Sequence, residues 1–143
     1  VYCCGDDGYF TVQALEPNFY AQFLDLMGLA GDVDFADQFD QTRWPVLTSR
    51  LAQIFAAKPR AHWTAIFAGS DACAGPVLNP EEASVEPHMQ ARGVWSSPEG
   101  RLQAVAAPRF DGANPLPPPP SPRRDQHRCS ILDELEQLER PGP

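Results

Sequence analysis

The sequence predicts an α+β fold in which helices predominate and the strands are few and short. Apolar residues recur at three- and four-residue intervals in stretches that begin at or beside a proline, which is typical of amphipathic helices. Short runs of β-forming residues border clusters of glycine, aspartate, serine and proline. A proline-rich stretch over 111–126 then precedes one last apolar-faced helix.

Two segments in the first half of the chain are predicted to be extended. Residues 1–15 predict a β-hairpin, because the turn cluster at 5–8 separates a short apolar run from a run rich in tyrosine, phenylalanine, threonine and valine. Residues 72–78 are small and apolar, and Gly75 with Pro76 favours a short strand over a helix.

Three helices are predicted in the same half. Pro17 suits the first turn of a helix, where its missing N–H leaves no bond unmade. Residues 44–57 carry apolar side chains at helical spacing. Pro59 starts a third helix, which we expect to stop at Gly69. The acidic segment 32–41 is either one short helix or a loop.

The second half begins with a helical stretch over 80–92 that should break near Pro87, since proline interrupts the helical hydrogen bonds. Residues 93–95 and 102–106 are predicted to pair as strands around the turn at 97–100.

Three parts are therefore expected: a small α/β domain over 1–110, a proline-rich linker over 111–126, and a C-terminal helix with its tail over 127–143. A block of about 110 residues can bury a real but modest core. The helix at 130–139 is too short to be stable alone, so it should dock on a surface outside this chain. Residues 119–124 fit the pattern of an SH3-domain ligand in a polyproline II linker, although a plain connector is the commoner explanation.

The charge balance excludes nucleic acid as a partner. The net charge is −8, whereas phosphate binding needs a basic surface. Eight acidic residues precede the first basic one, Arg43, and a solvated acidic face is the simplest interpretation. Their spacing lacks the one-three-five pattern of a calcium loop, so no calcium site is predicted.

No run of about 18 apolar residues occurs, and the start of the chain lacks the basic and apolar regions of a signal peptide. We therefore expect a soluble protein without a membrane partner, in the cytoplasm, or in the peroxisome or mitochondrion of a eukaryote. The chain starts at Val1 rather than at a methionine, and we expect the C-terminal portion of a longer protein.

The four cysteines do not predict a metal site or a disulfide framework. No CxxC pair and no Cys/His cluster with zinc spacing occurs. Cys3 and Cys4 are adjacent, and a bridge between neighbours would be strained. Reduced thiols are the expectation, with Cys73 buried in its apolar run.

Several strings, taken in order, resemble the small domain of the family III (CaiB/BaiF) CoA-transferases, and within that family they most resemble the alpha-methylacyl-CoA racemases. The tail departs from the family pattern, because DQHR stands at 125–128 where a Gly-x-His-Thr stretch is usual. The strings that carry the resemblance are DGYFTV at 7–12, ALEPNFY at 14–20, LMGL at 26–29, RWP at 43–45, FA at 55–56, HW at 62–63, IF at 66–67, SDACAGPVL at 70–78, PH at 87–88, RG at 92–93 and APRF at 107–110.

The resemblance implies a Rossmann-like large domain that binds CoA and is mostly absent from this chain, with the small domain closing over it and two chains interlocked as a homodimer. It implies an acyl-CoA thioester as substrate, with no permanently bound cofactor and no metal. In the racemase members, a His and an Asp of the large domain move the alpha proton of a 2-methylacyl-CoA. In the transferase members, a large-domain Asp forms an acyl anhydride. This chain alone is therefore expected to be inactive.

Three residues are candidates for the site. Glu16 matches the family glutamate that supports the catalytic His across the domain cleft, whereas the residues alone explain it as an anion at a helix N-terminus. Asp71 is a possible cleft residue but more simply ties up backbone N–H groups in a turn. His88 is a general base only if it faces a cleft. The tryptophans Trp44, Trp63 and Trp95 are expected in the core.

Two functions from different classes remain open. The first is part of an enzyme, either an isomerase that racemises a 2-methylacyl-CoA or a CoA-transferase. The second is a non-catalytic remnant or interaction module. The coding sequence upstream of Val1 discriminates between them, because an open frame that encodes a large domain favours the enzyme.

Overall fold

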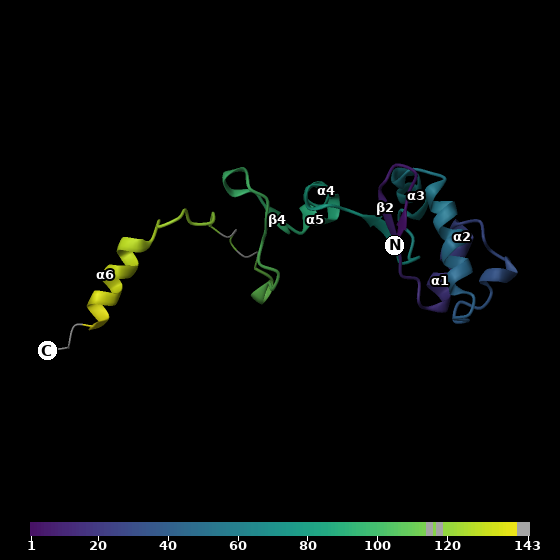
Figure 1. Cartoon of the computed structure of the whole chain (residues 1–143), viewed down its shortest axis with the longest axis horizontal. Helices are drawn as coiled ribbons and strands as arrows, with labels where there is room; N and C mark the ends of the chain where they lie inside the picture. Colours follow the sequence, from purple (N-terminus) through teal and green to yellow (C-terminus); the bar gives the residue numbers. More distant parts are fainter. Residues whose placement is uncertain (114–115, 117–118, 140–143) are drawn as a thin grey trace. The chain divides into compact units, whose positions relative to one another are not determined.

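The computed structural model describes residues 1–113, 116 and 119–139. Its contacts divide the chain into two compact units, Val1–Asn79 and Pro80–Pro143, and Figure 1 labels the helices α1 to α6 and two of the strands along the chain. The predicted α+β class is confirmed, because short antiparallel strands and helices make up both units. The predicted small domain over 1–110 spans the point of division, and its boundary stays a prediction.

The first unit contains a three-stranded antiparallel sheet in the order β1-β2-β3. The predicted hairpin is present, with β1 (Tyr2–Cys3) paired to β2 (Tyr9–Val12). The predicted short strand is β3 (Ala74–Val77), which pairs with the whole of β2. It lies at the edge of the sheet, which is where a strand tolerates a proline such as Pro76.

All three predicted helices of this unit form. They are α1 (Pro17–Leu26), α2 (Trp44–Ala56) and α3 (Arg60–Phe67), and α3 ends before a left-handed Gly69 with φ of 71°. Helix α2 packs against β1, and α3 packs against β3 and β2. The acidic segment forms one 3₁₀ turn, η1 (Val33–Phe35), within a loop.

An aromatic core joins these helices to the sheet. Phe55 has no exposed surface, and its ring lies 5.0 Å from Tyr2, 5.5 Å from Phe10 and 5.0 Å from Trp63, between centroids. Trp63 also donates its ring N–H to the Phe55 carbonyl at 3.0 Å, so its polar atom is satisfied inside the core. Stacked and tilted aromatic rings therefore run through the core of the first unit, beside buried aliphatic residues such as Leu47 and Leu51.

The expectation that Trp44 is a core residue is wrong. Its side chain is 46% exposed, whereas Trp63 is buried and Trp95 is half-buried. The ring N–H of Trp44 donates to the carbonyl of Gln38 at 3.0 Å, and this bond holds the indole against a loop at the surface.

The second unit begins with the predicted helical stretch, which breaks as expected into α4 (Pro80–Val85) and α5 (Pro87–Ala91). Strands β4 (Trp95–Ser96) and β5 (Gln103–Ala104) then pair antiparallel around the predicted turn. The last helix, α6 (Arg128–Glu139), starts two residues earlier than the sequence predicts.

The described side chains of α6 are all exposed over 128–138, including its apolar residues. The expected docking of this helix on another surface stays a prediction. Residues 114, 115, 117 and 118 of the predicted polyproline linker lie outside the described residues. In the part of the chain that is described, no helix is both long enough and apolar enough to cross a membrane. The apolar residues that α6 exposes are Ile131, Leu132, Leu135 and Leu138.

Candidate functional site

Glu16 is the N-cap residue of α1 and has extended backbone, with φ of −74° and ψ of 143°. Its carbonyl accepts the N–H of Tyr20 at 2.9 Å and so starts the helix. An N-cap side chain usually accepts an N–H from the first turn, but the exposed Glu16 carboxylate makes no such bond. The carboxylate is therefore available to a partner outside its own helix.

The segment around Glu16 is held by a loop from elsewhere in the first unit. Gln38 donates its side-chain N–H to the carbonyl of Leu15 at 2.6 Å, and the Gln38 carbonyl accepts the indole N–H of Trp44 at 3.0 Å. Leu15 itself is 65% exposed, so the residue directly before Glu16 presents an apolar side chain to solvent. No sequence pattern pointed to Gln38, because its hydrogen-bond partner lies 23 residues away.

A cavity of about 150 Å³ is lined in part by Gln38 and Trp44. Two of its polar groups are tyrosine hydroxyls, and the Tyr20 hydroxyl donates to the Phe35 carbonyl at 3.0 Å. Burial raises the pKa of Tyr20 and of Tyr2, so both hydroxyls stay neutral at physiological pH. The full lining of the cavity is Tyr2, Tyr20, Phe35, Gln38, Trp44, Leu47, Thr48 and Leu51.

Asp71 is exposed in the connection between α3 and β3. The expectation that its carboxylate ties up backbone groups is wrong, because Ser70 closes this turn instead. Both the N–H and the hydroxyl of Ser70 donate to the Phe67 carbonyl, at 3.1 and 2.8 Å. Among the described residues, Asp71 makes no side-chain hydrogen bond, so a role at the cleft stays a prediction.

Cys73 is exposed, and the prediction of a buried thiol is wrong. The buried residue of this run is the neighbouring Ala72. Cys73 has a left-handed backbone with φ of 48°, which breaks the alternation of side chains just before β3. Its carbonyl accepts the N–H of Gln13 at 2.9 Å.

This bond between Gln13 and Cys73 brings together the two segments that carry Glu16 and Asp71. Each candidate lies only two or three residues from the bonded pair, in the same unit. His88 is different, since it lies exposed in α5 of the second unit. The first unit therefore holds two of the three predicted site residues near one junction, without a contact between them.

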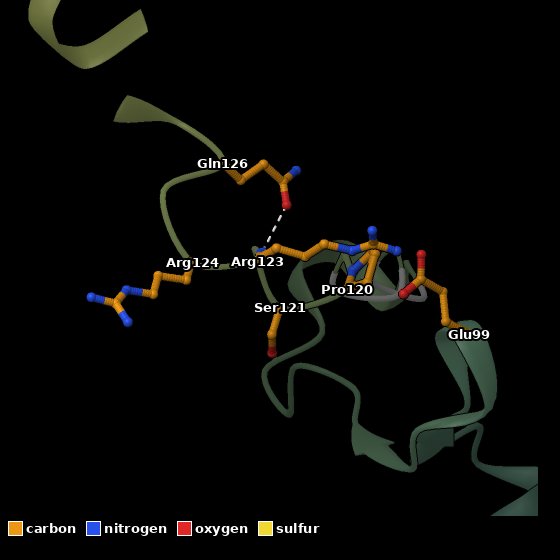
Figure 2. Close-up of a pocket in the computed structure, with 6 residues that line it drawn as sticks. All are labelled: Glu99, Pro120, Ser121, Arg123, Arg124 and Gln126. Atoms are coloured by element: carbon orange, nitrogen blue, oxygen red, sulfur yellow. Dashed lines mark hydrogen bonds between the residues drawn. The ribbon is translucent and has the colours of Figure 1, made fainter. Parts of the chain in front are cut away.

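A larger cavity of about 570 Å³ lies in the second unit and contains none of the predicted site residues. Figure 2 shows Glu99 on one side and the segment from Pro120 to Gln126 on the other, with Arg123 extending toward Glu99 and Arg124 pointing away. The side-chain oxygen of Gln126 accepts the Arg123 N–H at 2.8 Å. This lining offers charge but no paired acid and base, so it is a poor candidate for proton transfer.

Within the described residues, no group of three His, Cys, Asp or Glu side chains is placed to hold a metal ion. Two carboxylates of the acidic segment are instead paired with arginines. Arg50 contacts Asp32 at 2.6 Å and Asp34 at 3.3 Å, and Arg43 also pairs with Asp34. These carboxylates are therefore part of a structural ion-pair network on α2 and η1.

Comparison with known proteins identifies the family. The sequence model of CoA-transferase family III matches residues 1–128, which is most of the chain. The chain belongs to CoA-transferase family III. The resemblance that the sequence strings predicted is thereby confirmed.

Two relatives of this family III chain carry the name alpha-methylacyl-CoA racemase. The protein from Homo sapiens is 34% identical over 139 residues, and the one from Mus musculus is 33% identical over 138 residues. The matches cover 94% and 93% of this chain but 35% of each relative. The chain thus spans about a third of the length of these relatives.

Solved structures of the family share the fold. A CaiB/BaiF family protein from Brucella suis superposes with a TM-score of 0.63 at 22% identity, covering 94% of this chain and 36% of its own. The protein Rv3272 from M. tuberculosis also has a TM-score of 0.63, at 18% identity, covering 90% of this chain and 36% of its own. At these sequence identities, the similarity establishes only the fold of the chain.

Proposed function

We propose that this chain is the small-domain part of an enzyme that racemises 2-methylacyl-CoA thioesters by proton transfer at the alpha carbon. The observation that carries the proposal is the similarity to two alpha-methylacyl-CoA racemases, at 33–34% identity over more than nine-tenths of the chain. The carboxylate of Glu16 supports it, because we match this residue to the family glutamate, and its side chain makes no capping hydrogen bond to its own helix.

Racemisation requires two acid/base groups on opposite faces of the alpha carbon and stabilisation of the enolate oxygen. We assign these groups to a His and an Asp in a part of the protein outside this chain. Glu16 is then a positioning residue, because a carboxylate on one imidazole N–H fixes the tautomer of the His and favours its protonated form. The working enzyme in this proposal is a homodimer that takes an acyl-CoA substrate and needs neither a metal nor a permanently bound cofactor.

A second candidate is a CoA-transferase, which the name of the family itself favours. In that reaction a carboxylate of the enzyme attacks the thioester carbonyl, and CoA leaves as the thiolate to give a mixed acyl anhydride. The thiolate then attacks the enzyme's own carbonyl of this anhydride, which releases the first acid as a carboxylate and leaves an enzyme–CoA thioester. The acceptor carboxylate takes CoA from this thioester by the same steps in reverse. The two reactions differ in their products. A racemase exchanges the alpha proton with solvent, whereas a transferase moves CoA to an added carboxylic acid.

The first experiment tests whether this chain is inactive by itself. Incubated with 2-methylacyl-CoA in deuterated water, it should incorporate no deuterium at the alpha carbon, as followed by mass spectrometry. Incorporation above the uncatalysed rate would contradict the assignment of the His and Asp to another part of the protein.

A chimera gives the positive test. When this chain replaces the matched segment of the human racemase, the folded chimera should bind CoA and exchange the alpha proton. Glu16→Gln should slow exchange by about ten- to a hundredfold and shift the pH-rate profile, since the imidazole loses its carboxylate. Asp25→Asn, an exposed carboxylate on the same helix, is the matched control and should leave both rate and profile unchanged.

The outcomes separate the candidates. Deuterium exchange without CoA transfer supports the racemase, and transfer to an added acid without exchange supports the transferase. If Glu16→Gln leaves rate and pH profile unchanged in an active chimera, Glu16 acts only at the start of α1.

A further inference from the structure

A small cavity in the second unit is lined by two arginines and by no acidic side chain. It has a volume of about 110 Å³. Arg92 follows α5, and Arg109 lies beyond β5, so the two guanidinium groups come from separate segments. The remaining walls are glycine and small apolar residues, and the full lining is Arg92, Gly93, Val94, Val105, Ala106, Ala107 and Arg109.

The β4–β5 hairpin fixes the two segments relative to each other. Trp95 pairs with Ala104, and just outside that pair the N–H of Val105 donates to the Val94 carbonyl at 2.8 Å. Arg92 is anchored separately, because its N–H donates to the His88 carbonyl at 3.0 Å. Backbone hydrogen bonds thus hold the cavity wall from Arg92 to Val94, and Val105 across from it, within one unit.

The charges of these two arginines are not compensated. In the described part of the chain, neither Arg92 nor Arg109 has an ion pair or a side-chain hydrogen bond. Arg43 and Arg50 of the first unit show the contrast, since both are paired with carboxylates. Two unpaired guanidinium groups at one cavity in a chain of net charge −8 attract an external anion.

We propose that this cavity binds a phosphate group through Arg92 and Arg109. A guanidinium group presents its donors in a fork that matches phosphate oxygens, and a phosphate monoester carries a charge of nearly −2 that two arginines neutralise. A carboxylate would leave one positive charge without a partner. At about 110 Å³, the cavity is small enough to suit one phosphate group rather than a whole nucleotide.

The phosphate has two possible sources, inorganic phosphate or the terminal phosphate of a larger molecule such as CoA. The site does not depend on the proposed racemase activity, because it is argued from the second unit alone. A failed exchange assay would leave the phosphate site standing, and a failed phosphate titration would leave the racemase proposal standing.

The test is a titration of the full chain with inorganic phosphate, monitored by heteronuclear NMR at low ionic strength. Saturable shifts should centre on the backbone amides of residues 92–94 and 105–109. Arg92→Gln and Arg109→Gln should each weaken phosphate binding by about tenfold or more, since each removes charge-assisted hydrogen bonds. Arg101→Gln is the matched control, because Arg101 is exposed in the same unit but does not line the cavity.

Parallel titrations with CoA, dephospho-CoA and acetate identify the source. Tighter binding of CoA than of dephospho-CoA, lost in both arginine variants, supports a coenzyme phosphate. Binding of inorganic phosphate at least as tight as that of CoA supports the free anion. Phosphate binding no tighter than acetate binding, or equal in wild type and both folded variants, would overturn the proposal.

Discussion

The side-chain N–H of Gln38 lies 2.6 Å from the carbonyl oxygen of Leu15, to which it donates a hydrogen bond. This bond connects the loop after η1 to the residue directly before Glu16. The Gln38 carbonyl in turn accepts the indole N–H of Trp44, the first residue of α2. The position of the Glu16 carboxylate therefore depends on a loop as well as on α1.

Gln38→Ala should loosen this segment without unfolding the unit. We expect a loss of about 0.5–1 kcal/mol in the free energy of unfolding, at the low end for a hydrogen bond because the groups are exposed. Hydrogen exchange by mass spectrometry should show faster exchange over residues 14–18. Gln41→Ala, at an exposed position in the same loop, is the control, and equal effects of the two variants would contradict the assigned role of Gln38.

Phe55 should be the most costly residue to truncate in the first unit. Phe55→Ala removes a fully buried ring that contacts Tyr2, Phe10 and Trp63, and it should cost about 3–5 kcal/mol in urea unfolding followed by circular dichroism. Phe110→Ala is the control, since Phe110 is 81% exposed, and it should stay within about 0.5 kcal/mol of wild type. A loss below about 1 kcal/mol for Phe55→Ala would mean that the aromatic cluster is not the core.

The elements of this fold were predictable because their signals are local. Pro17, Pro59 and Pro87 each mark a helix start that proline favours by its fixed φ and missing N–H. The paired strands followed from β-forming runs on either side of turn residues. Helix starts and short hairpins are thus encoded by neighbouring residues.

The contacts that shape the candidate site were not predictable in this way. Gln38 and Leu15 are 23 residues apart, and Asp6 accepts the N–H of Arg60 at 3.0 Å across 54 residues. The predictions that Trp44 and Cys73 are buried were wrong. An apolar sequence pattern does not determine the direction in which each side chain points. The resemblance to the family identified Glu16 as a candidate. That its carboxylate makes no capping hydrogen bond is known only from the structure.

The closeness of Arg92 and Arg109 follows from the register in which β4 and β5 pair. With Trp95 opposite Ala104, continuing the antiparallel pairing outward places Arg92 across from the segment that leads to Arg109. The sequence predicted the hairpin but not its register. Without the register, no sequence pattern indicated that Arg92 and Arg109 line the same cavity.

Gly5 should tolerate no side chain. A Cβ there would lie 2.8 Å from the carbonyl oxygen of Ala56 and 3.3 Å from the backbone of Lys58, neither of which can rotate away. Gly5→Ala should therefore cost about 1–3 kcal/mol in urea unfolding, as overpacked sites do. Gly75→Ala is the matched control, because a Cβ at Gly75 meets nothing within 4 Å, and the two variants should differ clearly in their midpoints.

The four thiols should divide into a fast and a slow class. Cys3, Cys73 and Cys129 are exposed, whereas Cys4 is buried, and burial followed by the nearby Asp6 carboxylate raises the pKa of the Cys4 thiol. Ellman's reagent at pH 8 should react quickly with three thiols of the native chain and with all four in urea. Cys4→Ser should remove only the slow phase, and any other change would contradict this assignment.

Asp32 should make the first unit sensitive to acid. The Arg50 side chain bonds to this carboxylate at 2.6 Å and the Asp34 N–H bonds to it at 2.9 Å, and these contacts hold the pKa of Asp32 below its ordinary value of about 3.9. A carboxyl whose pKa is lower in the folded state stabilises that state when ionised. Its contribution is complete above the ordinary pKa and is lost as the pH falls through the lower folded-state value.

Asp32→Asn should consequently be less stable than wild type at pH 7 and nearly equal to it at pH 2. Urea unfolding at a series of pH values measures this difference directly. Asp25→Asn, which alters an exposed carboxylate without a side-chain hydrogen bond among the described residues, should show little difference from wild type at either pH. A deficit of Asp32→Asn that remained the same from pH 7 to pH 2 would place its cause in packing or backbone geometry, because protonation removes the charge of wild-type Asp32 over that range.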